Sequence, residues 1–350
     1  MMQDTGYKIN RESCIMNPAS LLIAEAIGYK ALKALSVSSR TAKVHSIFDR
    51  AFYIQIDRNT LISVIKNKDY ISSTSISVKE SKDKSFKSIG IKEGMKIVVD
   101  NHSLLFGDNA LTIKLRKSSN WFPPPIPKQG DLTGLTGIGL NLRILRDVIY
   151  TSPTREGLVP LLENVELYGP LNIFVRPQEP SVSERARANI ETMMWGLHRG
   201  DLDMVLKNAQ SVLGLGRGLT PSCDDFLTGL MISLTIGGKA LLKKNKGELG
   251  FYRKASAEIC RLAKVKTTIY SQILLNQARF GEGPKAVVDL VHSLLTKKPP
   301  HVANVSKTVI NMGETSGADI AIGIFYGIRF LLSKLEHSSL KSLEDLYEIA

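Results

Sequence analysis

The chain has 350 residues, of which 43% are hydrophobic and 23% are charged, and this composition excludes a largely disordered protein. Its length favours two domains over one small module. Three cysteines without Cys-x-x-Cys spacing exclude a disulfide framework or a cysteine zinc site, and they favour the reducing cytoplasm.

The formal net charge of +13 raises the question of nucleic acid as a partner. Much of this charge is local, because residues 239–266 are rich in Lys and Arg and contain only Glu248 and Glu258 as acids. Nucleic-acid surfaces usually interleave aromatic side chains with the cations, and here only Phe251 and Tyr252 qualify. We therefore interpret the segment as a solvated helical face with a Lys-rich loop and do not expect nucleic acid to bind. The alternative is a positive field that steers small anions to a nearby site.

No membrane segment is expected. The first residues, MMQDTGYKINRESC, lack the charged-then-apolar layout of a signal peptide. The most apolar runs, residues 226–238 and 320–332, are shorter than the roughly 20 residues that span a bilayer, and the second contains Arg329. Both runs are predicted to be buried core helices of a cytoplasmic protein.

The first predicted element is a helix over residues 17–35, because Asn17 can cap it, Pro18 suits its first position and helical apolar spacing follows. Short β-rich segments then begin at residue 41, separated by Asp, Asn, Gly or Lys. They are AKVHSIFDRAFYIQI, TLISVI, SISVKE, MKIVVD, SLLFG and ALTIKL. Such regular spacing is typical of a small antiparallel barrel or sandwich, and we place this β-rich domain at residues 17–125.

A proline-rich stretch, WFPPPIPKQGDLTG, ends the β-rich domain, because proline feeds neither a sheet ladder nor a helix interior. We interpret residues 126–180 as a linker and mixed connection, in which residues 163–175 are a candidate for one or two strands. Residues 181–350 are predicted to form a mainly helical domain, so the predicted fold class is α+β. The predicted helices are 137–150, 181–199, 201–213, 222–240, 251–280, 284–296, 301–311 and 317–336.

Glycines and acids coincide in GLGRGLTPSCDDFLTGL, residues 214–230. Three glycines in five positions permit positive φ and a close approach of backbone N–H groups to a ligand. The Thr-Pro pair predicts a helix start with Thr220 as N-cap, and the unpaired N–H groups at such a helix end favour an anion. The arginine among the glycines can clamp a phosphate or carboxylate. The predicted binding residues of this loop are Gly214, Gly216, Arg217, Gly218, Thr220 and Ser222.

Two adjacent carboxylates, Asp224 and Asp225, follow the loop and would repel a bound phosphate unless a cation intervenes. Mg²⁺ binds carboxylate and phosphate oxygens together, so one interpretation is a magnesium site. The alternative is that one carboxylate orients a loop donor and never meets the ligand. Neighbouring helical residues point about 100° apart, so we do not expect both to serve one ligand, and the choice stays open. Cys223 between them is interpreted as a packing residue, because nearby carboxylates raise a thiol pKa.

A second loop repeats the order of glycine, hydroxyls, Asp and apolar helix in NMGETSGADIAIGIFYGIRFLL, residues 311–332. Small residues recur at four-residue spacing in the helices that follow both loops. They are Gly229, Ser233 and Gly237 in the first helix, and Gly323 and Gly327 in the second. We predict that these helices pack in parallel through those faces, which brings both loops to one end.

A third segment, residues 264–283, places paired threonines before a further helix, although a capped helix alone would explain it. The two further segments add Thr267, Thr268, Thr315, Ser316 and Gly317 to the predicted binding residues. Asp319 joins Asp224 and Asp225 as a candidate magnesium ligand.

The three segments in this order, with the β-rich part before them, resemble the AllH family over most of the chain. The strongest shared motif is Gly-Leu-Thr-Pro-Ser-x-Asp-Asp. The resemblance implies a subunit of oxamate carbamoyltransferase, which interconverts oxalurate plus phosphate with oxamate plus carbamoyl phosphate. It also implies small anionic substrates, Mg²⁺ and two companion subunits, but it hands over no agreed catalytic residue.

The chain departs from the family pattern at two positions, with Cys223 in place of glycine and Arg217 in place of a frequent proline. If that glycine needs positive φ, Cys223 is strained. The leading expectation is an enzyme subunit for carbamoyl transfer that acts with its companions. The alternative is a non-catalytic structural or regulatory subunit that binds an anion and leaves the chemistry to them.

Overall fold

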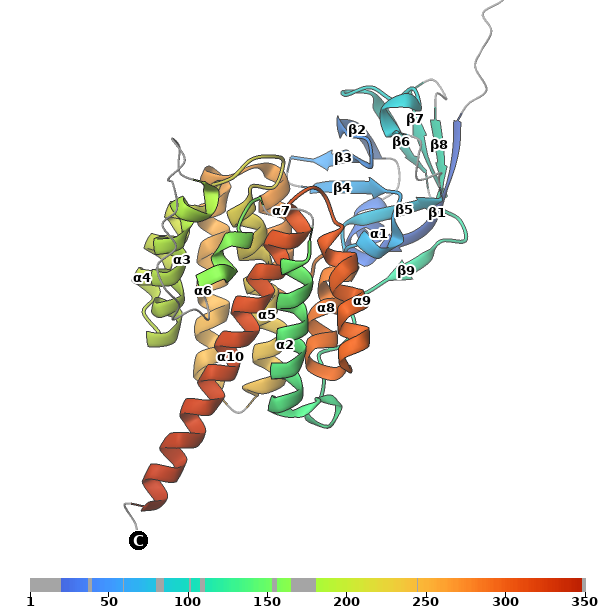
Figure 1. Ribbon diagram of the computed structural model, residues 1–350. Helices are drawn as coiled ribbons and strands as arrows, with labels where there is room; N and C mark the ends of the chain where they lie inside the picture. The colour runs from blue at the N-terminus through green and yellow to red at the C-terminus, as the bar shows by residue number, and fades with distance from the viewer. Residues whose placement is uncertain are drawn as a thin grey trace, which may run out of the picture. The chain divides into compact units, whose positions relative to one another are not determined.

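Strands come first along the chain and helices follow, which is the α+β class that the sequence predicts (Figure 1). The computed structural model describes residues 20–36, 40–58, 60–79, 85–100, 102–107, 111–152, 156–164, 181–243 and 245–347. The chain divides into two compact units. The first is Met1–Lys66 with Thr74–Asn120, and the second is Asn67–Ser73 with Trp121–Ala350.

Eight strands of the first unit close into a barrel, so the barrel is the correct one of the two predicted β architectures. The order is β5-β4-β3-β2-β6-β7-β8-β1, with β5 paired back to β1, and β9 is also hydrogen-bonded to β1. The strands are β1 (Ser20–Gly28), β2 (Arg40–Ile47), β3 (Ala51–Asp57), β4 (Thr60–Ile65), β5 (Ser75–Lys79), β6 (Lys96–Asp100), β7 (Ser103–Phe106), β8 (Leu111–Lys114) and β9 (Ser119–Trp121). Closure leaves the ring without an unpaired edge.

The helix predicted over residues 17–35 is wrong for residues 20–28, which form β1. Only Tyr29–Leu35 is helical, as α1. Asn17 and Pro18, which carried the predicted helix start, lie outside the described residues.

The side chains of β1 alternate in burial, which is the period of a strand. Leu22 and Ala24 are buried, whereas the residues on either side of Leu22 are half exposed. Leu22 lies opposite Ile113 of β8, and Ala24 lies opposite Val78 of β5. Pairing with strands on both sides therefore outweighs the helix propensity of the Leu and Ala residues in this segment.

Three phenylalanines pack edge to face inside the barrel. The ring centroid of Phe52 lies 5.0 Å from that of Phe86 and 5.8 Å from that of Phe106. All three side chains are fully buried. Phe86 belongs to the short helix η2 (Phe86–Ser88), so this segment must be held firmly to keep its ring in the core.

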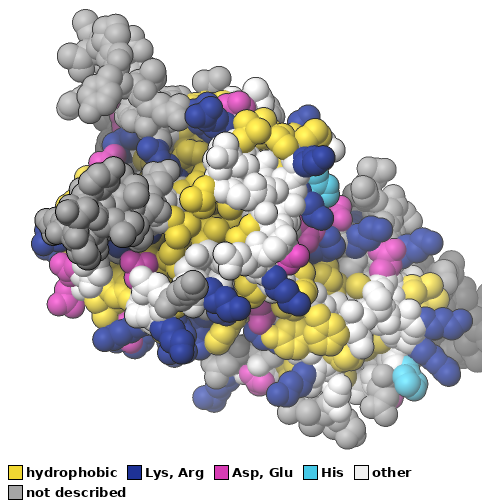
Figure 2. All heavy atoms as spheres, turned by 90° about the horizontal axis from the view of Figure 1, so that it is seen from below, with side chains coloured by type: hydrophobic (Ala, Val, Ile, Leu, Met, Phe, Trp, Pro, Cys, Tyr) yellow, Lys and Arg dark blue, Asp and Glu magenta, His cyan; other side chains and the backbone are white. Residues whose placement is uncertain are grey.

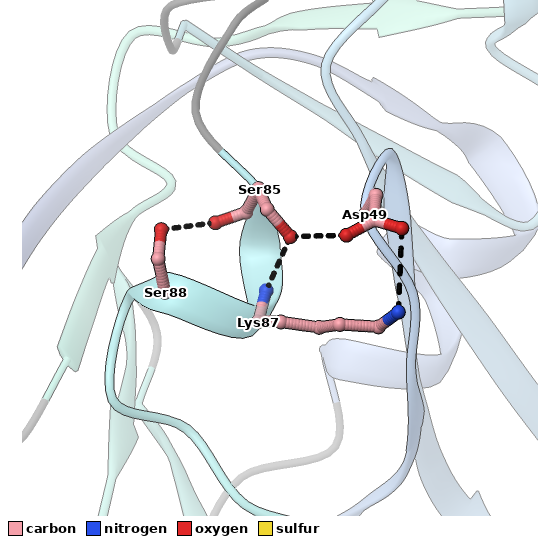
Figure 3. Close-up of polar contacts among 4 residues, drawn as sticks. All are labelled: Asp49, Ser85, Lys87 and Ser88. Atoms are coloured by element: carbon pink, nitrogen blue, oxygen red, sulfur yellow. Dashed lines mark hydrogen bonds and ion pairs between the residues drawn. The ribbon is translucent and has the colours of Figure 1, made fainter.

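The turn between β2 and β3 holds η2 in place (Figure 3). The backbone N–H of Phe86 donates to the Asp49 carbonyl at 3.0 Å, and the Ser85 hydroxyl donates to the Asp49 carboxylate at 2.5 Å. Lys87 Nζ reaches the second carboxylate oxygen at 3.3 Å. The hydrogen bonds from Ser85 and Lys87 lower the pKa of Asp49, which is the expected effect of donors on the charged form.

The second unit is built from helices, with end shifts of a few residues for most of the predicted ones. They are α2 (Gly134–Tyr150), α3 (Val182–Arg199), α4 (Leu202–Val212), α5 (Ser222–Leu241), α6 (Lys246–Lys266), α7 (Ile269–Ala278), α8 (Lys285–Thr296), α9 (Pro299–Ile310) and α10 (Ser316–Tyr347). A short helix, η4 (Val159–Asn164), follows α2 and includes the first two residues of the candidate strand region, whereas residues 165–175 lie outside the described residues. None of the described helices combines the length and apolarity needed to cross a membrane.

The single helix predicted over residues 251–280 is wrong, because the chain breaks between α6 and α7. Thr267 is extended, with φ −143° and ψ 179°. Thr268 is the N-cap of α7, and its hydroxyl accepts a hydrogen bond from the Ser271 N–H at 3.2 Å. The paired threonines thus favour a helix start over continuation of the helix before them.

Helices α5 and α10 pack in parallel, as the small-residue spacing predicts (Figure 1). A side chain at Gly229 would strike the Ile320 carbonyl, and one at Gly323 would strike the Phe226 carbonyl. One turn further along, a Cβ at Gly327 would come within 2.6 Å of the Ser233 Cβ. Residues 226–229 of α5 thus lie beside residues 320–323 of α10, and Ser233 lies beside Gly327. Residue numbers rise in the same direction along both helices, so both begin at the same end.

The segment Asn67–Ser73 connects two strands of the barrel, yet it belongs to the helical unit. The Tyr70 hydroxyl donates to the Thr308 carbonyl at 3.3 Å, and the Lys285 N–H donates to the Ile71 carbonyl at 2.7 Å. The helical unit therefore includes residues from both sides of the Asn120–Trp121 boundary.

Basic side chains are spread over the face that Figure 2 shows. On this face, Lys and Arg side chains stand in several places, separated by hydrophobic, acidic and uncharged groups. A continuous basic stripe of the kind that follows a nucleic-acid backbone is not seen on it. The expectation that nucleic acid does not bind stays a prediction.

Candidate functional site

The three segments singled out in the sequence meet at the end of the helical unit where α5, α7 and α10 begin. The Thr220 and Ser316 hydroxyl oxygens lie 3.1 Å apart, which joins the first loop to the start of α10. The Thr268 hydroxyl donates to the Leu219 carbonyl at 2.5 Å, which joins the same loop to the start of α7. The predicted meeting of the first two loops is therefore confirmed, and the third segment lies beside them.

Each glycine of the first loop has positive φ, and two of them lie where no side chain fits. Gly214 has φ +78°, and a Cβ there would strike the Lys266 carbonyl. Gly216 has φ +130°, and a Cβ there would strike the Ser222 backbone nitrogen. Gly218 has φ +91° with open space around it. The loop therefore needs glycine for its path at all three positions, and for close packing at the first two.

Residues 216–220 present free backbone donors. Among the residues that the structure describes, their N–H groups have no hydrogen-bond acceptor. Positive φ at Gly216 and Gly218 flanks negative φ at Arg217, and such alternation is the pattern of backbone anion nests. The Arg217 side chain is exposed within this stretch. The loop thus combines backbone donors and one cation at the surface.

Helix α5 begins at Ser222, as the predicted range has it, but the predicted N-cap Thr220 does not cap it. Pro221 is the N-cap, and its carbonyl accepts from the N–H groups of Asp224 and Asp225 at 2.9 and 3.1 Å. The Cys223 N–H donates to the Leu215 carbonyl at 3.0 Å. The chain itself therefore occupies these donors at the helix start, and the free N–H groups belong to the loop before it.

Asp224 holds the loop to α7. Its carboxylate accepts from the Gly214 N–H at 2.9 Å and from the Thr267 hydroxyl. The side chain is buried, with 1% exposed, and burial raises its pKa, against the lowering effect of these two donors. Asp224 thus takes the role of a carboxylate that orients loop donors, one of the two predicted alternatives.

Asp225 holds the loop to α10. The Thr220 hydroxyl donates to its carboxylate at 3.0 Å, and Ser316 lies within hydrogen-bond reach as well. Burial raises the pKa of Asp225 well above its ordinary value, and the nearby Asp319 charge adds to this. The hydroxyls of Thr220 and Ser316 oppose the shift by favouring the charged form.

Asp319 joins α10 to residues 157–158, which lie in the stretch interpreted from the sequence as a linker and mixed connection. Its carboxylate accepts from the Leu158 N–H at 2.7 Å, and a Cβ at Gly157 (φ +69°) would lie 2.5 Å from the same oxygen. Burial raises the pKa of Asp319 to about 6, although Leu158, Ser222 and Thr315 all lower it. Sequence reasoning missed Gly157 and Leu158; the isolated glycine before an apolar run was the available signal.

The remaining predicted residues have structural partners. Ser222 and Thr315 place their hydroxyls near the Asp319 carboxylate. Gly317 lies against α9, where a Cβ would strike the Val309 carbonyl, so its contact is one of helix packing. Cys223 is buried in the first turn of α5 without positive φ, so the strain expected from the missing glycine does not occur. Burial and the charges of Asp319 and Asp224 raise its thiol pKa, as expected for a packing residue.

The three carboxylates do not fit a magnesium site as they stand. Each is almost fully buried and accepts hydrogen bonds from the chain's own hydroxyl or N–H groups. Among the described residues, no group of three His, Cys, Asp or Glu is arranged to hold a metal ion. Mg²⁺ therefore stays a prediction, and these carboxylates brace the loops instead.

Two family models match the chain. Residues 212–328 match the model described as oxamate carbamoyltransferase subunit AllH, and this interval contains every predicted binding residue of the three segments. Residues 22–120 match the model described as the AllH family N-terminal domain, which is the barrel region. The chain belongs to the AllH family. No solved structure matches it.

Membership in the AllH family makes this chain a relative of enzyme subunits, whose name implies companion chains. The matched interval begins at Val212, two residues before the first glycine of the loop. It ends within α10, beyond the close contact with α5. The family match thus coincides with the loops and the helix pair that positions them.

Proposed function

We propose that this chain is a subunit of an oxamate carbamoyltransferase and that the loop of residues 214–220 binds the small anions of that reaction. The supporting observation is the run of free backbone donors at residues 216–220, which includes Arg217 and has hydroxyls beside it. Backbone N–H groups and a guanidinium stabilise phosphate or carboxylate oxygens.

The chemistry needs no nucleophilic side chain. The amide nitrogen of oxamate forms a bond to the carbamoyl carbon of carbamoyl phosphate, and the bond from that carbon to the phosphate oxygen breaks. The nitrogen loses a proton, and inorganic phosphate and oxalurate leave. The donors of residues 216–220 and Arg217 hold the phosphate and stabilise the charge that develops on it.

The hydroxyls of the site can bind the amide nitrogen of the substrate. Because the Thr220 hydroxyl donates its proton to Asp225, its oxygen is available to accept a hydrogen bond from an N–H group of the substrate. Ser316, next to Thr220, can supply a second contact from α10. Mg²⁺, when bound to the phosphate, would offset its charge without calling on the buried carboxylates.

A second candidate is a non-catalytic anion-binding subunit. The observation that favours it is the burial of Asp224, Asp225 and Asp319, because none of these carboxylates is exposed to act on a substrate. In this case the loop would bind an anion that regulates or stabilises the complex, and the companion subunits would carry the reaction.

Thermal unfolding of the purified chain tests the proposal, with carbamoyl phosphate, oxamate and Mg²⁺ added singly and together. A ligand at about 100 times its Kd stabilises by roughly 2.7 kcal/mol, which raises Tm by several degrees. Arg217→Ala should remove most of the shift, whereas Arg199→Ala, a change of an exposed arginine at the end of α3, should keep it. A shift of the same size in Arg217→Ala would contradict the proposed binding loop.

The complex with its companion subunits separates the two candidates. If the chain is catalytic, Arg217→Ala in the purified complex lowers the rate of carbamoyl transfer at saturating substrate. If it is regulatory, the rate at saturation stays unchanged and only the response to added anion is lost. Co-purification of the complex in both variants is the control for assembly.

A further inference from the structure

A cavity of about 790 Å³ lies in the helical unit beside the C-terminal half of α5. Five cationic side chains line it and come from three parts of the chain. Lys239 belongs to α5, Arg279 follows α7, and Lys246, Arg253 and Lys254 belong to α6. All of these cations except Arg279 lie in the basic segment of residues 239–266, which the binding loop does not use.

The cations of this cavity are unpaired among the residues that the structure describes. Of the described residues, no carboxylate lines the cavity and none forms an ion pair with the five cations. The two acids of the basic segment have other cations as partners. Glu248 pairs with Lys334 at 3.4 Å and accepts from the Tyr252 hydroxyl at 3.2 Å, and Glu258 pairs with Arg261 at 2.7 Å. Like charges gathered around one cavity repel one another, and a bound polyanion relieves that repulsion.

The walls between the cations are apolar and aromatic. Leu234, Leu249 and the buried Tyr252 line the cavity, together with Phe280. Phe280 is 51% exposed, and the Arg279 guanidinium lies over its ring at 4.5 Å from the centroid. Such a wall suits a ligand that carries a flat, partly apolar group beside its charges.

We infer that this cavity binds a nucleoside di- or triphosphate. Its volume lies in the range of sites for ligands of that size, whereas a single phosphate or a small dicarboxylate would leave most of it empty. The cations would hold the phosphates, and the aromatic wall would hold the base. The site is separate from the loop of residues 214–220 and does not depend on the function proposed for it.

Isothermal titration of the purified chain with ATP, ADP, AMP, adenosine and tripolyphosphate tests the inference. Affinity should fall from ATP to AMP, adenosine should bind weakest, and tripolyphosphate should bind at least several-fold more weakly than ATP. The double variant Arg253→Glu, Lys254→Glu should weaken ATP binding by about tenfold or more, which corresponds to about 1.4 kcal/mol.

A matched control keeps the change in net charge the same. Arg199→Glu, Lys207→Glu alters two exposed cations on α3 and α4, and it should leave the affinity for ATP within about twofold. Phe280→Ala should reduce the preference for ATP over tripolyphosphate while tripolyphosphate still binds. Arg217→Ala should keep full ATP affinity, so failure of the binding loop and failure of this cavity are distinguishable.

Three outcomes would overturn the inference. The first is ATP binding that is equal in the wild type and the Arg253→Glu, Lys254→Glu variant. The second is tripolyphosphate binding as tightly as ATP, because then the base makes no contact. The third is a short DNA oligonucleotide that displaces ATP with much higher affinity, which would assign the cations to a nucleic-acid surface.

Discussion

The two ends of helix α5 carry opposite charges in opposite settings. At its N-terminal end, Asp224 and Asp225 are buried, and the donors exposed to solvent are backbone N–H groups of the loop before the helix. At the other end, Lys239 and four further cations face an open cavity. Both arrangements agree with the helix dipole, which favours acids in the first turn and bases in the last. The two proposed anion sites would therefore use different donors, which are backbone N–H groups before the helix and exposed side chains at its other end.

The largest effect on the free energy of unfolding is expected from a substitution in the α5–α10 contact, which positions the loops. Gly323→Ala places a methyl group against the Phe226 carbonyl, so the helices must separate, at a cost of about 3 kcal/mol or more. Gly139→Ala in α2 is the matched control, because its Cβ meets nothing within 4 Å and it should stabilise slightly. Urea unfolding measures both. An unchanged stability in Gly323→Ala would mean that the two helices are not held this closely.

A comparable effect is expected from pH, through Asp319. Its pKa is raised from 3.8 to about 6 in the folded chain, so the folded state favours the protonated form. The free energy of unfolding should therefore fall as pH rises from about 4 to about 6, by up to about 3 kcal/mol from this group. Asp319→Asn should flatten that part of the pH profile. Equal profiles for the variant and the wild type would show that Asp319 has an ordinary pKa.

The smallest of these effects on stability is expected from loss of the Thr220 hydroxyl, which lies between the loop and α10. Thr220→Val removes a donor to the buried Asp225 and should cost about 1–3 kcal/mol in the free energy of unfolding. Thr220→Ser keeps the hydroxyl and should cost less than half as much. Chemical denaturation of both variants checks this. A serine variant as unstable as the valine variant would assign the loss to the methyl group and its packing.

Much of the site could be predicted from short-range patterns. Glycines at Gly229, Gly323 and Gly327 implied a close helix contact, because only a missing side chain lets two backbones approach so nearly. The parallel direction followed from the need to bring similar loops together. The regular β-rich segments likewise predicted the first unit, although closure into a barrel depends on pairings between distant strands.

Other features depend on partners that are remote in sequence. The apolar residues of strand β1 fit the period of a helix as well as that of a strand, and only pairing with β5 and β8 decides between the two. Thr220 was expected to cap α5, but the Asp225 carboxylate and the start of α10 engage its hydroxyl. The role of Asp319 needed Leu158, which lies 161 positions earlier in the chain and carries no polar side chain to reveal it.

The segment Asn67–Ser73 limits how the barrel and the helical unit can be separated or exchanged between relatives. The family models place the barrel and the helical region in separate intervals, as expected for two independent domains. Yet the barrel interval contains residues whose carbonyl and hydroxyl groups bond to Lys285 and Thr308 of the helical unit. A gene cut after Asn120 would leave the helical unit without one of its own pieces. Exchange of the barrel among relatives must therefore carry this short segment along, or supply a substitute that fits the same place.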